Sequence, residues 1–278
     1  MKNINKFWIL TFISLAFLGC EKDGVPEITK PYDGALFKTY NFVVVKSNPA
    51  SGASTVTFNS YANNVKFAAT VSTNGTEAAA GLVVGGVSPA RGYALVPAGD
   101  NVKFSALSSS TAVVNATYGF GPNLEIASVV ASVQNKKNYS FYVCGLFDKT
   151  TQKADAFIIE DKLPAPDTGA AYIRLVNPAP GTSTLSLETT RTYKVDGVDV
   201  VDVATPINGV AYKTASEFVK VPSGSYTFRC IDQATNKIVT RTATNLLRNR
   251  IYTFTMRGDM VRAGVSYPTV FLDFTENR

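Results

Sequence analysis

The chain has 278 residues, of which 45% are hydrophobic, and it carries 27 basic side chains against 21 acidic ones. This length is sufficient for two ordinary domains, each with a core of its own. The absence of histidine excludes Ser-His-Asp triads, Cys-His pairs and imidazole ligands for zinc or non-haem iron. Chemistry that uses carboxylates alone, as in glycosidases, is not excluded. The mild net positive charge does not indicate a nucleic-acid partner.

Residues 1–19 have the organisation of a bacterial lipoprotein signal peptide. Two lysines precede an apolar run over residues 7–18, and Cys20 follows a glycine. The apolar run is too short for a spanning helix. Its end resembles the lipobox, whose cysteine becomes lipidated, although Phe17 stands where that motif usually has leucine. We therefore predict that lipidated Cys20 anchors the protein to a membrane; the alternative is an ordinary secretory signal followed by an incidental cysteine.

Residues 20–35 are polar, contain Pro and Gly, and are predicted to form a tether. The acidic residues directly after Cys20 resemble the surface-export signals of Bacteroidetes lipoproteins, and the alternative is a linker that is simply charged. The expected location is the cell envelope, at the surface or the periplasmic face of the outer membrane.

The rest of the chain predicts an all-β protein. Short alternating runs of Val, Thr, Tyr and Phe are separated by Gly, Pro, Asn and Ser, and long stretches of helical period are absent. We expect two tandem antiparallel β-sandwich domains, Ig-like or transthyretin-like, over residues 36–163 and 170–278. Residues 164–169 contain two prolines and are predicted to be a short, stiff linker.

Three pairs of segments indicate that the two domains are copies of one module. They occur in the same order in each half. The pairs are Asn48-Pro49 with Asn177-Pro178, the Pro-Gly turns of residues 96–99 with 221–224, and the strands of residues 139–145 with 252–258.

In the first module, strands are predicted within residues 40–46, 56–58, 65–69, 93–106, 113–118, 126–133, 138–145 and 157–159. In the second, they are predicted within residues 172–176, 184–187, 193–200, 217–221, 226–230, 238–242, 251–256 and 270–274. Residues 193–200 read as a hairpin about a type I′ Asp196-Gly197 turn.

The second module resembles the domain-of-unknown-function family 4397. The segments that carry the resemblance are residues 172–177, 195–197, 221–226, 249–253 and Gly258. The first module matches less well, because Asp100-Asn101 stands where Gly-Ser-Tyr is expected and the Val-Asp-Gly segment has no clear counterpart. Members of this family occur in secreted and lipid-anchored bacterial proteins, often in tandem. The resemblance implies an architecture and a location but no chemistry.

The two remaining cysteines, Cys144 and Cys230, are predicted to lie in different environments. Cys230 is in register with Tyr226 and Phe228, whereas Cys144 alternates with Phe141 and therefore points to the other face of its strand. We expect Cys230 to be buried as a small apolar residue, Cys144 to be free, and neither to be a catalytic thiol, because no histidine base is present.

Charged and aromatic residues offer further candidates, each with a plainer alternative. Asp196, Asp199 and Asp202 lack the order of a calcium loop and are interpreted as solvent-facing hairpin carboxylates. Carboxylates for a glycosidase could come from Glu125, Asp148, Glu160, Asp161, Glu188 and Glu217, although surface solvation explains them adequately. Arg241, Arg248, Arg250, Arg257 and Arg262 could meet anionic glycans or lipid headgroups, or form a solvated sheet face. The tyrosines predicted to be exposed are Tyr32, Tyr118 and Tyr267.

These observations predict a non-enzymatic, lipid-anchored interaction or structural module of the cell envelope. We assign no catalytic residue, metal or cofactor, and the expected partners are the membrane and an envelope protein or glycan. The alternative is a glycan-binding or carbohydrate-active accessory lipoprotein of a polysaccharide-uptake system.

Overall fold

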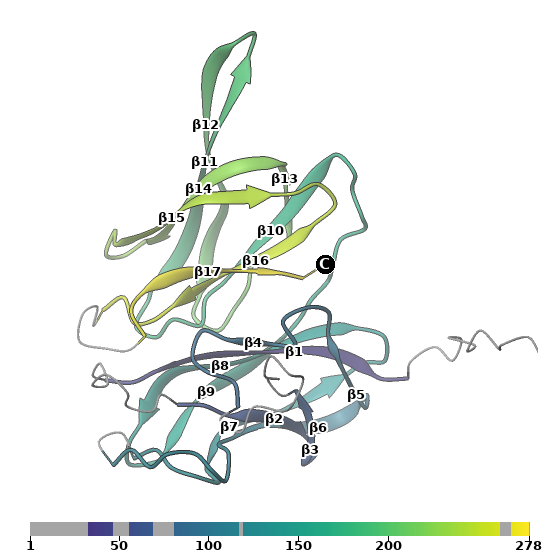
Figure 1. Ribbon diagram of the computed structural model, residues 1–278, viewed down its shortest axis with the longest axis vertical. Coiled ribbons are helices and arrows are strands. Elements are labelled where there is room, and N and C mark those ends of the chain that lie inside the picture. Colours follow the sequence, from purple (N-terminus) through teal and green to yellow (C-terminus); the bar gives the residue numbers. More distant parts are fainter. Residues whose placement is uncertain (1–32, 47–55, 69–80, 117–118, 262–267, 278) are drawn as a thin grey trace, which may run out of the picture. The chain divides into compact units, whose positions relative to one another are not determined.

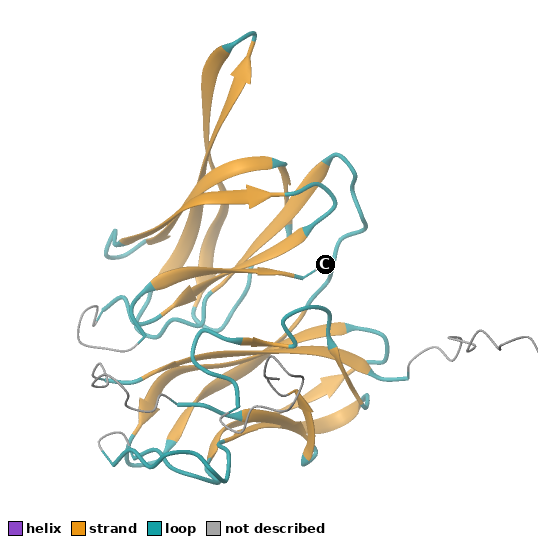
Figure 2. Cartoon of the chain, viewed as in Figure 1, coloured by secondary structure: helices purple, strands orange, loops and turns teal. Residues whose placement is uncertain are grey.

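In the computed structural model the described residues are 33–46, 56–68, 81–116, 119–261 and 268–277, and all their regular secondary structure is strand (Figure 2). The predicted all-β class is therefore confirmed. Within these ranges no helix is long and apolar enough to span a membrane. Residues 33–278 form one compact unit. The boundaries 36–163, 164–169 and 170–278 remain a prediction, and the signal peptide and most of the tether lie outside the described residues.

The N-terminal half of this unit, with strands β1 to β9, has two sheets (Figure 1). One has the order β4-β1-β8-β9, with β5 also paired to β1, and the other has the order β3-β2-β6-β7. The first comprises β1 (Ala35–Val44), β4 (Val87–Ser88), β5 (Ala94–Val96), β8 (Asn138–Asp148) and β9 (Lys153–Glu160). The second comprises β2 (Asn59–Ala62), β3 (Val65–Ala68), β6 (Gly99–Leu107) and β7 (Glu125–Val133).

The C-terminal half, with strands β10 to β17, repeats this plan. Its sheets have the orders β13-β10-β16-β17 and β12-β11-β14-β15. The first comprises β10 (Ala170–Val176), β13 (Val219–Pro222), β16 (Ile251–Arg257) and β17 (Phe271–Glu276). The second comprises β11 (Thr184–Val195), β12 (Val198–Ala211), β14 (Gly224–Asp232) and β15 (Ile238–Leu246). Strands β10, β16 and β17 thus take the places of β1, β8 and β9.

One pairing in each half departs from the antiparallel pattern expected from the sequence. Strand β1 runs parallel to β8, and β10 runs parallel to β16, whereas the other ladders between named strands are antiparallel. Parallel neighbours need a long crossover connection, and in each half this connection includes all the strands of the second sheet. Strand β1 is buried along almost its whole length, as expected for a central strand that is covered on both faces.

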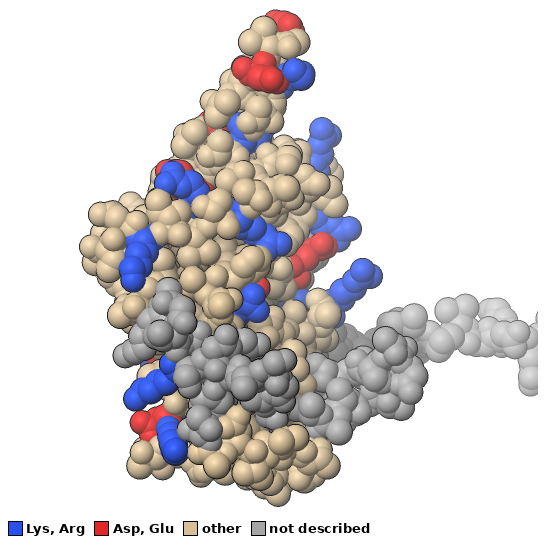
Figure 3. Space-filling model, turned by 60° about the vertical axis from the view of Figure 1, so that its left-hand side comes forward, with Lys and Arg blue, Asp and Glu red and all other residues tan. Residues whose placement is uncertain are grey.

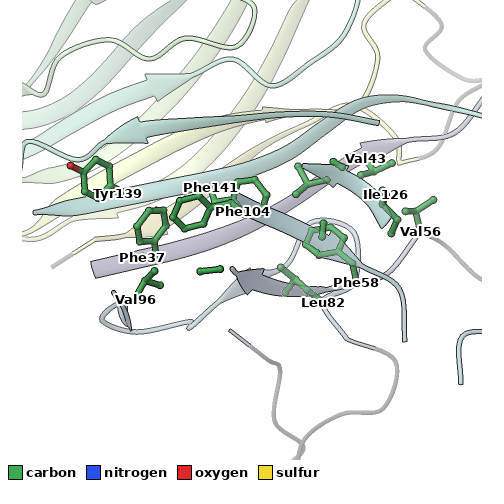
Figure 4. Packing of buried hydrophobic residues seen from close by; sticks show 14 of the residues in the cluster. Phe37, Val43, Val56, Phe58, Leu82, Val96, Phe104, Ile126, Tyr139 and Phe141 are labelled. Carbon is green, nitrogen blue, oxygen red and sulfur yellow. The ribbon is translucent and has the colours of Figure 1, made fainter. Parts of the chain in front are cut away.

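Each half has a core between its two sheets. In the first, the ring of Phe37 stacks on that of Phe104, with ring centroids 4.4 Å apart, and both belong to one buried cluster with Phe141 (Figure 4). In the second core, Phe228 and Cys230 are fully buried. The alternation of β14 therefore correctly predicted the face that it buries.

A third buried cluster lies on the opposite face of β1 and β8. It contains Tyr40, Tyr142 and Cys144 together with Val176 at the end of β10, so it joins the two halves. Cys144 points away from the core that contains Phe141, as its alternation predicted. Both described cysteines are free and buried, and burial raises the pKa of each thiol to about 12.

The strand predicted over residues 113–118 was wrong for its described part. Residues 113 and 114 are irregular and their side chains are 66% and 69% exposed, and Asn115 makes only an isolated bridge to Phe120. Valine favours strands because it packs against neighbouring strands, and no ladder forms here to provide that packing. The predicted type I′ turn is confirmed, because Asp196 and Gly197 have φ angles of 51° and 83° between paired Val195 and Val198.

Candidate functional site

Several residues singled out from the sequence lie outside the described ranges. They are the lipidation site Cys20, Arg262, and the tyrosines Tyr32, Tyr118 and Tyr267. The predictions made for them remain untested.

The three hairpin aspartates lie near the end of the β11–β12 hairpin. Asp199 forms an exposed ion pair with Lys194 at 2.9 Å. Asp202 is opposite Arg191 in the register, and Asp196 occupies the turn. No group of three or more His, Cys, Asp or Glu side chains in the described part of the chain is placed to hold a metal ion.

The carboxylates considered for a glycosidase are occupied by other contacts. Glu125, Glu160, Glu188 and Glu217 are ion-paired with Lys or Arg, and Asp148 accepts hydrogen bonds from the backbone of its own turn. Two of them, Glu160 and Glu217, line the same cavity of about 300 Å³. Each is paired with a lysine, at 3.1 Å and 4.0 Å respectively, so this cavity does not present two unpaired carboxylates to a glycosidic bond.

The arginines of the C-terminal half do not form one surface. The guanidinium groups of Arg241 and Arg257 both lie over the ring of Phe271, at 5.5 and 5.3 Å. Arg248 lines a separate cavity of about 430 Å³. Figure 3 shows Lys and Arg side chains scattered over a largely uncharged face rather than gathered in a patch. On this face, the basic side chains therefore do not form a broad basic surface.

Two deeply buried charges that pair with each other are Arg174 in β10 and Asp161, just after β9. Their side chains are 2% and 0% exposed, and the Nη2 atom of Arg174 donates a hydrogen bond of 2.5 Å to Oδ1 of Asp161. The other carboxylate oxygen accepts hydrogen bonds from Ser140 at 2.7 Å and Tyr93 at 2.9 Å. Since a buried charge needs a partner with satisfied hydrogen bonds, this pair fixes β9 and β10 together.

The hydrogen-bond network continues from this pair to the end of β17. Tyr93 accepts a hydrogen bond of 3.1 Å from the side-chain amide of Asn277, whose oxygen accepts one of 2.6 Å from Thr253. Nearby, the buried ammonium of Lys38 donates to the backbone oxygen of Glu276 at 3.1 Å and lies 5.3 Å from the ring centroid of Tyr93. Burial lowers the pKa of Lys38 and raises that of Tyr93.

A cavity of about 580 Å³ adjoins this network. We call it the arginine cavity; its lining residues are Ala90, Arg91, Gly92, Arg250, Glu276 and Asn277. The first three precede β5, Arg250 precedes β16, and the last two lie at the end of β17, so both halves contribute to it. The cavity is accessible and polar, and two guanidinium groups line it.

A second feature is the outer part of the β11–β12 hairpin. Strand β14 pairs with β11 only as far as Arg191, so residues 192–201 continue as a two-stranded ribbon beyond the sheet (Figure 1). We call these residues the ribbon. Three of its four valines are exposed: Val195 is 48%, Val198 66% and Val201 61% accessible. Acidic side chains lie at its end (Figure 3).

Sequence reasoning missed the buried pair, the arginine cavity and the exposure of the ribbon. One signal was present for the pair, because Arg174 interrupts an apolar strand, where a charge requires a buried partner. Lys38 interrupts the apolar strand β1 in the same way. The partners could not be read from the sequence, since Asp161 lies in the connection after β9 and Glu276 is more than two hundred residues from Lys38.

No family model and no curated protein matches this chain, so the resemblance to the family 4397 remains a prediction. Among solved structures, a "putative cell adhesion protein" from Parabacteroides distasonis is similar at 10% identity, with a TM-score of 0.24 and coverage of 89% of this chain and 97% of that one. A protein of the same description from Bacteroides ovatus has 8% identity, a TM-score of 0.25, and coverage of 90% and 99%. Similarity at this level supports no conclusion about the activity or ligand of this chain.

Proposed function

We propose that this chain is a lipid-anchored cell-envelope protein that acts without catalysis, as an interaction module held at the membrane by Cys20. The observation that carries the interaction role is the ribbon. Residues 192–201 contribute no side chain to any of the three buried clusters, and they expose valines on both strands. Exposed apolar side chains that stabilise no core are typical of binding surfaces.

The ribbon suits an extended protein partner. Strand β12 is the edge strand of its sheet, and an edge offers backbone groups to an added strand. The same edge carries Asp199 and Asp202, with Asp196 at the turn. We therefore propose that the partner is an envelope protein that adds a strand with basic side chains to β12, because opposite charges favour that encounter.

The test uses cells that make the full-length protein with a photoreactive amino acid at Val198, and a matched version with the same amino acid at Val130. Both valines are exposed, at 66% and 57%, but Val130 lies on β7 in the other half. We expect a discrete crosslinked protein adduct from Val198 alone. Equal adducts from both positions, or no adduct from either, would refute the proposal that the ribbon is the interaction surface.

A second variant removes the ribbon without disturbing the sheet. In this variant, Asn-Gly replaces residues 192–201 and forms a favoured two-residue turn between Arg191 and Asp202. These two residues already face each other in the register of the hairpin. For this variant the photoreactive amino acid is placed at Val203, which is 59% exposed and lies on β12 just outside the removed residues. We expect an unchanged thermal midpoint, and an adduct at Val203 in the full-length protein that is lost when the ribbon is removed. If the adduct persists, the partner binds elsewhere.

The membrane half of the proposal has its own test. Native protein should incorporate a fatty-acid analogue, whereas Cys20→Ala should not, and protease treatment of intact cells then reports the side of the membrane. Release of the modules from intact cells would place them outside. Equal labelling of both versions would refute lipidation at Cys20.

The second candidate function is glycan capture in a polysaccharide-uptake system. The arginine cavity is the observation that favours it, because its size and polar lining suit a sugar. Retention of native protein on a glycan array, with loss of retention in a variant of the cavity, is the expected result. Absence of retention on acidic and neutral glycans alike would exclude this function.

A further inference from the structure

The arginine cavity carries more cationic than anionic groups. Arg250 forms an ion pair with Glu276 at 2.8 Å, which leaves both side chains nearly half exposed. Among the described residues, Arg91 has no acidic partner within ion-pair distance. Beneath the lining residues, the buried ammonium of Lys38 donates a hydrogen bond to the backbone oxygen of Glu276. Among the described lining residues, one carboxylate therefore stands against two guanidinium groups.

One side of the cavity, which we call its back wall, is formed by Asn277, and hydrogen bonds within the protein hold this residue in place. The side chain of Asn277 is held by Tyr93 and Thr253, and its backbone N–H donates to Ile251 at 2.8 Å. Because Tyr93 is itself bonded to buried Asp161, the wall rests on the buried ion pair. A wall ordered in this way lowers the entropy that a ligand must lose on binding.

The chemistry of the lining selects the ligand. Guanidinium groups present a planar fork of donors that matches a carboxylate or sulfate, and a volume of about 580 Å³ falls in the range of small-molecule sites. We propose that the arginine cavity binds an oxyanion, a carboxylate or sulfate, carried by an acidic sugar, with Arg91 as its principal contact. The oxyanion site stands independently of the ribbon; the choice of a sugar rests on the second candidate function.

Binding is measured by calorimetric titration of the detergent-solubilised full-length protein at low ionic strength. The probes are glucuronate and glucose 6-sulfate, with neutral glucose and inorganic sulfate as comparisons. The variant is Arg91→Gln, and its matched control is Arg248→Gln, because Arg248 lies in the same β15–β16 connection as Arg250 but lines a different cavity. Thermal melting of each variant verifies that it is folded.

We expect saturable binding of at least one acidic sugar, weakened roughly tenfold or more by Arg91→Gln and unchanged by Arg248→Gln, because a hydrogen bond to a charged group is lost. Binding should also weaken with added salt, since exposed charges are screened. Equal binding by wild type and folded Arg91→Gln, or no saturable binding of either acidic sugar, would overturn the proposal. Inorganic sulfate binding as tightly as glucose 6-sulfate would refute the assignment to a sugar. If no sugar binds but the crosslink at Val198 still forms, the oxyanion proposal fails while the interaction role proposed for the ribbon still stands.

Discussion

Replacing Asp161 by Asn should strongly destabilise the protein, because it leaves the guanidinium of Arg174 buried without a counter-ion. Asp161 accepts three hydrogen bonds, from Arg174, Ser140 and Tyr93, and the two charged side chains are at most 2% exposed. Removing one partner of such a buried pair costs roughly 3–5 kcal/mol. For a chain of this size, that corresponds to a fall in Tm of about 10 °C.

The matched control makes the same change in an exposed ion pair. Asp199 pairs with Lys194 at 2.9 Å, with side chains 63% and 66% exposed, so Asp199→Asn should cost less than about 1 kcal/mol. Urea unfolding of wild type, both variants, Arg174→Met and the double variant of Arg174 and Asp161 gives the coupling energy. We expect the double variant to be more stable than the sum of the single effects implies. A cost for Asp161→Asn no greater than that for Asp199→Asn would refute the reasoning.

Two further predictions concern particular residues of the C-terminal half. Burial raises the pKa of Asp273 to about 6 despite its ion pair with Arg257 at 3.1 Å. The folded state therefore binds this proton more tightly than the unfolded one, so stability should fall by up to about 3 kcal/mol as pH rises from 4 to 7. Urea unfolding of Asp273→Asn across this range should show that part of the pH dependence removed, and an unchanged pH profile would contradict the shift. Gly258 has a φ of 88°, and an added Cβ would lie 2.9 Å from the backbone of the segment after it, so Gly258→Ala should cost roughly 2–4 kcal/mol. Gly99→Ala is the control, because the nearest atom to its Cβ would be 3.5 Å away, and equal Tm values for the two would rule out this steric explanation.

Local features of the fold were predictable because they depend on neighbouring residues. The alternation of Tyr226, Phe228 and Cys230 identified a buried face, and Asp196-Gly197 identified a turn that requires two positive φ angles. The opposite orientation of Cys144 followed from the same period of two. In each case the information lies within a few residues of the position that it describes.

Features that depend on distant pairing were not predictable in the same way. The parallel ladder between β1 and β8 joins segments about a hundred residues apart, and the apolar pattern of β1 does not name its neighbour. The hairpin of residues 193–200 was predicted, but its projection as a ribbon depends on where the pairing between β11 and β14 stops, at Arg191 opposite Tyr226. The arginine cavity combines three segments that only the folded chain brings together.

The comparison of the two halves supports a specialised role for the ribbon. Strand β3 and strand β12 occupy the same place in their sheet orders, but the hairpins that they close differ. Strand β2 is still paired with β6 at Ala62, directly before the turn to β3, whereas the pairing of β11 with β14 stops at Arg191, before the turn to β12. The projecting part of β12 lies beyond its core contacts, since Ile207 and Val210 near its C-terminal end are its members of the buried cluster. A long edge strand that exposes valines invites unwanted pairing, and proteins usually shorten or block such edges. The hairpin of the first half turns at the end of its pairing with β6 and has no such projection. The ribbon therefore carries an aggregation risk that the stability of the core does not require, and the proposed binding role would account for it.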